Sequence, residues 1–149
     1  MLNLIKSLVG LNAAMSKKIR SVQACEEGLA FSNANEFKKA FPLLLEASEL
    51  GNEKAMSVLG SMYLLGQGTP ENGVEAVRWL ENSIKMGFDD AISVLGMAYV
   101  TGKAGVKIDI EKGREMLIHA AESGDEQSAR MLGMMDRREG MFRHLKKKR

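Results

Sequence analysis

Apolar residues recur at intervals of three and four along most of the chain, and this spacing predicts amphipathic helices. The spacing is clear where Ala76, Trp79, Leu80 and Ile84 fall on one helical face. A shorter apolar pattern near the N-terminus predicts an amphipathic helix over residues 1–17 that packs on the rest of the protein. The pattern therefore predicts a series of helices that bury one face each.

The helical pattern repeats with a period of 36 or 37 residues. Its first segment occurs three times, with a degenerate earlier copy, at residues 55–63, 91–99, 128–136 and 24–31. Its second segment also occurs three times, and each copy ends in a glycine that is typical of a left-handed helix terminus: Gly51, Gly87 and Gly124. The repeating unit is therefore predicted to be a helix, a loop, a second helix and a sharp turn.

The residue types at repeated positions indicate how these helices pack. Gly60, Gly96 and Gly133 fall at equivalent places in the first segment and predict that a second helix approaches closely there. The loops that follow the first segments are long and rich in glycine, and Asn72 and Asp109 are placed to cap the next helix.

The motif Ala-x3-Leu-Gly-x2-Tyr, followed by Gly-x-Gly and then Ala-x2-Trp, resembles the Sel1-like repeat (SLR), a relative of the tetratricopeptide repeat. The resemblance divides the chain into an N-terminal helix and five further parts: a degenerate tetratricopeptide-like repeat (18–51), two Sel1-like repeats (52–87 and 88–124), a C-terminal capping helix (125–138) and a basic tail (139–149). It implies an all-α solenoid of antiparallel helix pairs with about seven to eight helices. It also implies a non-enzymatic scaffold for protein–protein interaction.

The composition fits one small helical domain. The chain has 149 residues, of which 45% are hydrophobic and 5% aromatic, and its eleven Met suit helix packing better than a β-rich core. Cys25 is the single cysteine and cannot form an internal disulfide, which favours a reducing, cytoplasmic compartment. The alternative for the first residues is an N-terminal signal or a membrane-associated helix.

The net charge of +2 conceals a strongly uneven distribution. Residues 1–20 carry four bases and no acid, and residues 137–149 carry seven bases and one acid. Residues 21–136 therefore have a net charge of −8. An acidic body favours a basic partner, whereas the basic ends favour an anionic one.

Side chains with catalytic or metal-binding chemistry are scarce. His119 is expected on the outer face of a helix, His144 in the basic tail, and Cys25 has no histidine nearby in the repeat alignment. The glycine-rich loop at residues 66–73 lacks the Lys-Ser/Thr ending of a phosphate-binding loop. The sequence therefore predicts no enzyme activity, no metal and no cofactor.

In stacked helix pairs, the first helix of each pair lines the concave face, and exposed positions there vary with the partner. The positions predicted to form a partner-binding groove are Lys54, Ser57, Ser61, Leu64, Leu65, Asp90, Ser93, Met97, Val100, Thr101, Arg130 and Met134. A helix or an extended peptide is the predicted occupant, because methionine-rich surfaces adapt to such ligands.

Three functions remain open from the sequence. The first is an adaptor or regulator, of bacterial type, that binds a protein partner in this groove. The second is a bacterial immunity or inhibitor protein that neutralises a basic toxin. The third is an accessory protein that contacts nucleic acid or a membrane surface through its basic tail, whose charged residues are Arg143, Lys146, Lys147, Lys148 and Arg149.

Overall fold

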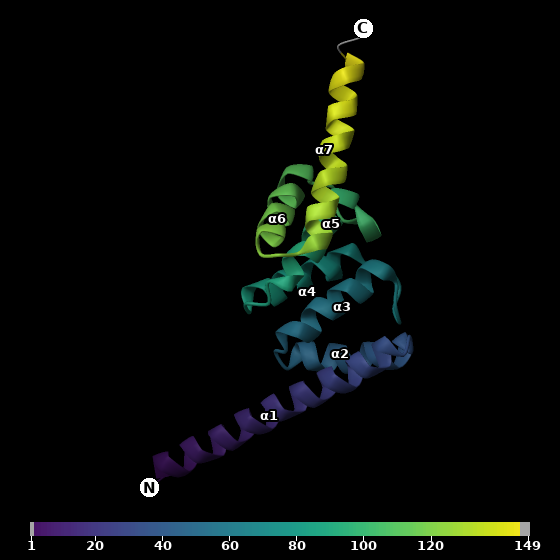
Figure 1. Cartoon of the computed structure of the whole chain (residues 1–149). Coiled ribbons are helices and arrows are strands. Elements are labelled where there is room, and N and C mark those ends of the chain that lie inside the picture. Colours follow the sequence, from purple (N-terminus) through teal and green to yellow (C-terminus); the bar gives the residue numbers. More distant parts are fainter. Residues whose placement is uncertain (1, 147–149) are drawn as a thin grey trace.

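A computed structural model describes the backbone of residues 2–146 and the side chains of residues 5–138. The described residues form seven α-helices, one short 3-10 helix and no strand. Figure 1 shows the helices stacked one after another. The elements in order are α1 (Leu2–Asn33), α2 (Phe37–Glu49), α3 (Glu53–Leu65), α4 (Gly73–Lys85), α5 (Asp90–Thr101), the short 3-10 helix η1 (Lys103–Gly105), α6 (Ile110–Glu122) and α7 (Glu126–Lys146). This confirms the all-α solenoid predicted from the repeats.

The helices pack as three pairs: the C-terminal part of α1 with α2, α3 with α4, and α5 with α6. One core is built around Ala24 of α1, Leu44 of α2 and Ala55 of α3, and a second around Leu80 of α4 and Leu95 of α5. Trp79, predicted to be buried, is 5% exposed and packs with Met56 and Leu59 in a third cluster. α7 stacks on α6 and closes the array.

Local sequence signals account for most helix ends. The side chains of Asn52, Asn72 and Asp109 each accept a hydrogen bond from a backbone N–H three residues later, at 3.0 to 3.1 Å. This confirms the predicted caps at Asn72 and Asp109 and adds one at Asn52. Each second helix of a pair is followed by a glycine with φ between +90° and +100°, as predicted: Gly51, Gly87 and Gly124.

The predicted close helix approach is present at two of the three glycines. A Cβ on Gly60 would lie 2.6 Å from Leu80 Cγ, and a Cβ on Gly96 would lie 3.2 Å from Leu117 Cγ. Gly133 was expected to behave in the same way, but no atom of the other described residues lies within 4 Å of its Cβ position. The prediction for Gly133 is wrong because α7 is followed by no second helix among the described residues.

The predicted N-terminal helix of residues 1–17 is not a separate element that packs on the body. One continuous helix, α1, begins at Leu2 and ends at Asn33, and residues 5–20 are all exposed. Contact with the body begins at Arg20, which pairs with Glu46 of α2, and burial begins at Ser21 and Ala24. Figure 1 shows the first half of α1 extending away from the stack.

α7 likewise continues past the predicted end of the capping helix at residue 138. Its backbone remains helical as far as Lys146, so Arg143 and Lys146 of the predicted tail belong to a helix. The side chains of both residues, and the whole of Lys147, Lys148 and Arg149, lie outside the described residues.

Candidate partner-binding groove

The array carries an apolar hollow of about 360 Å³ between α3 and α5. α3 contributes Ser61, Leu64 and Leu65, and α5 contributes Ser93, Val94, Met97, Ala98 and Thr101. Lys103, Asp125 and Gln127 complete the rim from η1, from the turn before α7 and from α7 itself. We call this hollow the α3–α5 groove.

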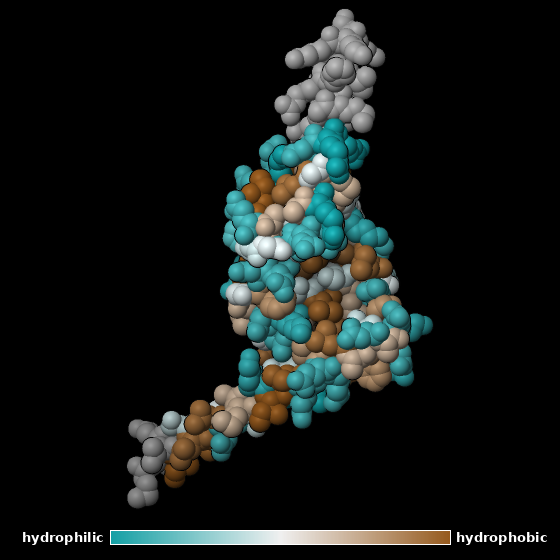
Figure 2. All heavy atoms as spheres, viewed as in Figure 1, coloured by the Kyte–Doolittle hydropathy of each residue, from teal (hydrophilic) through white to brown (hydrophobic). Residues whose placement is uncertain are grey.

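The floor of the α3–α5 groove is available to a ligand. Leu64 is 6% exposed and forms part of the core, whereas Leu65 beside it is 55% exposed. Met97 is half-buried at the junction with a second hollow. In Figure 2, hydrophobic residues are visible across the middle of the stacked body, between hydrophilic flanks.

The hydroxyl groups on the groove have fixed hydrogen-bonding roles. Thr101 Oγ1 donates to the carbonyl oxygen of Met97 at 2.8 Å, and Ser61 Oγ donates to that of Ser57 at 3.1 Å. Ser93 Oγ donates to the carbonyl oxygen of Asp90 at 3.1 Å. Because each hydroxyl already donates its hydrogen bond to a carbonyl oxygen of its own helix, it can only accept hydrogen bonds from an occupant of the groove.

The groove continues along α7 into a wider hollow of about 680 Å³. The two hollows share Met97 and Gln127, and the second adds Arg130, Met134 and Arg137. Met134 is 47% exposed, so the apolar surface extends from Leu65 to the first half of α7. This part of the groove has a basic border.

An acidic hollow adjoins the other border of the groove and shares Ser93 and Asp125 with it. It has a volume of about 360 Å³ and is lined by Asp89, Asp90, Ser93, His119, Ala120, Ser123, Gly124 and Asp125. The groove therefore adjoins an acidic hollow at Ser93 and Asp125 and a basic one at Met97 and Gln127.

The structure brings nine of the twelve predicted groove residues to these three connected hollows. Ser61, Leu64, Leu65, Ser93, Met97 and Thr101 line the first, Arg130 and Met134 the second, and Asp90 the third. Lys54, Ser57 and Val100 line none of them. Ser57 is 6% exposed, and Val100 faces α6, where its Cγ2 would lie 2.7 Å from a Cβ on Gly113.

Five residues that line the α3–α5 groove are not among the twelve predicted positions: Val94, Ala98, Lys103, Asp125 and Gln127. Val94 and Ala98 lie next to Ser93 and Met97 in the chain, so a wider helical face would have included them. Lys103 lies in η1 and Asp125 in the turn before α7, so the helical periodicity of α3 and α5 could not predict either residue.

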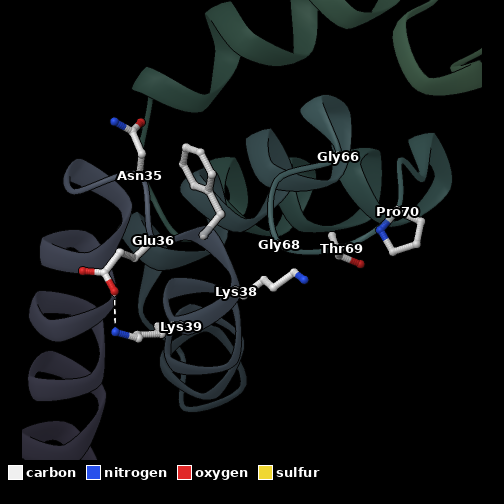
Figure 3. Close-up of a pocket in the computed structure, with 9 residues that line it drawn as sticks. Asn35, Glu36, Lys38, Lys39, Gly66, Gly68, Thr69 and Pro70 are labelled. Carbon is white, nitrogen blue, oxygen red and sulfur yellow. Dashed lines mark hydrogen bonds and ion pairs between the residues drawn. The ribbon is translucent and has the colours of Figure 1, made fainter.

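A separate hollow of about 670 Å³ lies between the start of α2 and the loop from α3 to α4. Figure 3 shows Lys38 extending toward Thr69 and Pro70, while Lys39 turns back to pair with Glu36. Gly68 packs directly on this turn of α2, because a Cβ there would lie 2.3 Å from the carbonyl oxygen of Phe37. The glycine-rich loop therefore serves as a packing connector, as expected from its sequence.

Candidate nucleophiles and metal ligands do not assemble into a site among the described residues. Cys25 is 4% exposed, and burial raises the pKa of its thiol, which keeps the sulfur protonated at neutral pH. No group of three or more His, Cys, Asp or Glu in this part of the chain is arranged to hold a metal ion. No helix in the same part is both long and apolar enough to cross a membrane.

The fold and groove define a short α-solenoid of antiparallel helix pairs with an apolar concave face. The Sel1 repeat family matches residues 53–88 and 89–125, so this part of the chain consists of two Sel1 repeats. Proteins of this family are generally non-enzymatic scaffolds for protein interaction. No curated protein matches the sequence.

Solved structures share the fold. A Sel1 repeat protein from Oxalobacter formigenes is 24% identical with a TM-score of 0.60, and the alignment covers 69% of this chain and 44% of that one. A protective antigen of uropathogenic Escherichia coli with an SLR fold is 27% identical with a TM-score of 0.64, covering 79% and 26%. Cysteine rich protein B of Helicobacter pylori is 23% identical with a TM-score of 0.56, covering 80% and 95%. The chain thus spans less than half the length of the first two.

Proposed function

We propose that this chain is a protein-interaction scaffold that binds one protein partner in the α3–α5 groove and its extension along α7. The observation that carries the proposal is the exposed apolar floor, in which Leu65 and Met134 keep about half of their surface in contact with solvent. Exposed apolar surface within a concave site is typical of ligand-binding grooves. The scaffold function of the family supports the same conclusion.

The shape of the groove favours a helix or an extended segment as its occupant. The apolar surface follows two neighbouring helices and then α7, so it is longer than a pocket for one side chain. Met97 and Met134 have flexible, unbranched side chains that adjust to different apolar ligands. A segment with apolar side chains at helical spacing would fill the floor.

The groove also favours a particular charge on one side of its occupant. Asp89, Asp90 and Asp125 gather at one border, and the nearby hydroxyls present only acceptors. A Lys or Arg side chain of the partner would satisfy both features. The partner is therefore a protein segment whose apolar side chains contact the floor and whose Lys or Arg side chain reaches the acidic border.

This charge preference keeps the immunity or inhibitor function as a second candidate. Residues 21–136 have a net charge of −8, and an acidic body of this kind suits a basic toxin. An adaptor in the cytoplasm would use the same groove for a signalling or secretion component. The nucleic-acid or membrane function of the basic tail stays a prediction, since its side chains lie outside the described residues.

The groove is tested by affinity capture with three forms of the full chain. Leu65→Glu combined with Met97→Glu places two carboxylates on the apolar floor. Val74→Glu, at a position 79% exposed on α4, is the control for an added charge elsewhere. Circular dichroism establishes that all three forms keep the same helix content.

We expect at least one protein to be captured by the wild type and by Val74→Glu but lost with the groove variant, in quantitative mass spectrometry of a native lysate. Its identity separates the candidates, because a toxin would support inhibition and a regulator or secretion component would support an adaptor. Equal capture of every protein by all three forms would contradict the groove assignment.

A further inference from the structure

The exposed half of α1 carries an unpartnered apolar face. Ile5, Leu8, Leu11, Met15 and Ile19 are each between 53% and 60% exposed, and every residue from 5 to 20 is classed as exposed. Figure 2 shows hydrophobic residues along this segment where it leaves the body. Large apolar side chains at helical spacing on a solvated helix indicate a surface that is covered in use.

These side chains share one face of the helix. At 3.6 residues per turn, the five lie within an arc of roughly 120°. Lys18 borders this arc on one side, whereas Lys6 and Lys17 lie on the opposite half of the helix. The segment is therefore amphipathic, with an apolar face and a basic back.

The body of the same chain does not cover this apolar face. The residues of α1 that are buried by the body, Ser21, Ala24, Cys25 and Gly28, lie on a face turned by roughly 150° from the centre of the apolar arc. Ile5 is also about 24 Å along the helix from Ser21, given a rise of 1.5 Å per residue. Both the direction and the distance keep the arc away from α2.

The charge of the segment identifies what would cover it. Residues 1–20 hold four bases and no acid. A second copy of residues 1–20 packed on the first would bring bases against bases with no acid in the segment to pair them, which opposes association. An anionic phospholipid surface would attract the bases and accept the apolar side chains.

We propose that the N-terminal half of α1, over residues 5–20, docks in the plane of an anionic phospholipid bilayer. The acidic body does not prevent this docking. Electrostatic interactions between exposed groups are screened over about 8 Å at physiological ionic strength, and the first turns of α1 lie farther than that from the body. The array would then hold its groove at a membrane surface.

Co-sedimentation of the full chain with vesicles tests the proposal. We expect the protein to pellet with vesicles of equimolar phosphatidylglycerol and phosphatidylcholine, to stay in the supernatant with phosphatidylcholine alone, and to release at high salt. Leu8→Gln with Leu11→Gln should weaken binding by about tenfold or more, because two buried leucines are lost without a change in charge. Ala13→Gln with Ala14→Gln, away from the apolar arc, is the matched control and should bind as the wild type does.

Three results would overturn the proposal. The first is no pelleting with the anionic vesicles. The second is equal loss in the Leu and Ala variants. The third is light scattering that shows a dimer dissociated by the Leu8 and Leu11 substitutions, in a protein that does not bind vesicles, since a second copy would then cover the face. The groove variant Leu65→Glu, Met97→Glu should bind vesicles normally, so this test and that of the groove fail independently.

Discussion

Gly60 of α3 lies directly against Leu80 of α4, with no room for a side chain between them. The same relationship occurs in the helix pairs on either side. A Cβ on Gly28 would lie 2.7 Å from Leu44 Cγ, and one on Gly96 would lie 3.2 Å from Leu117 Cγ. One glycine and one leucine therefore set the separation of the two helices in each pair.

This contact predicts the effect of adding one methyl group at equivalent glycines. Gly60→Ala should lower the free energy of unfolding by about 1–3 kcal/mol, because Leu80 and the backbone of α4 must move. Gly133→Ala should leave it unchanged or raise it by up to about 1 kcal/mol, since the site is open and alanine favours helix. Urea unfolding followed by circular dichroism measures both. A loss of the same size at Gly133 would show that α7 has a close partner there.

The cap at Asn52 should contribute more stability than that at Asn72. Both side chains accept a backbone N–H at the start of their helix, but Asn52 is 9% exposed whereas Asn72 is exposed. Asn72→Ala should cost about 1 kcal/mol and Asn52→Ala about 2 kcal/mol, because the N–H of Ala55 would be left buried without an acceptor. Urea unfolding gives both values. Asn52→Asp should lose much less stability than Asn52→Ala, because its carboxylate can accept the same hydrogen bond. Equal losses in Asn52→Ala and Asn72→Ala would argue against burial as the cause.

Two ion pairs predict how stability depends on pH. Arg20 of α1 donates from Nε and Nη2 to Glu46 of α2 at 2.6 and 2.7 Å, and these hydrogen bonds lower the pKa of the Glu46 carboxyl. Arg78 lowers the pKa of Glu75 in the same way. The folded state therefore binds fewer protons than the unfolded state, in which a glutamate has a pKa of about 4.3.

The stability from both pairs should be present above about pH 4.3 and lost as the pH falls through the folded-state values. The melting temperature, measured at a series of pH values from neutral to acidic, should decrease as the pH falls below about 4.3. Glu46→Gln should make the decline shallower, whereas Glu49→Gln, at an exposed position of the same helix, is the control. The change should be small because both pairs are largely exposed. An identical decline in wild type and Glu46→Gln would contradict this prediction.

Cys25 should be unreactive in the folded protein. Its side chain is 4% exposed and its thiol pKa is raised by burial, so both access and thiolate formation are limited. Labelling with iodoacetamide at neutral pH should be slow in the native state and fast in urea. Labelling at the rate of a free thiol without denaturant would show that the α1–α2 pair opens.

The sequence determined the local structure of this protein. The 36- and 37-residue period, the capping side chains of Asn72 and Asp109 and the glycines that end the second helices predicted the repeating helix pair, because each of these signals acts within a few residues. Most of the groove could also be predicted, since Ser93, Met97 and Thr101 follow one helical face.

Only the tertiary structure decided which surfaces remain open. Ser57 and Val100 share helices with residues that line the hollow, but Ser57 is buried and Val100 faces α6. Gly133 occupies a packing position that no other described residue fills. Whether a side chain is covered depends on which helices stack against it and at what angle, and a repeat pattern contains the same residues in either case. The exposure of α1 was also decided by the tertiary structure. The sequence predicts the apolar face of this helix, but the way α1 packs on α2 leaves that face in contact with solvent.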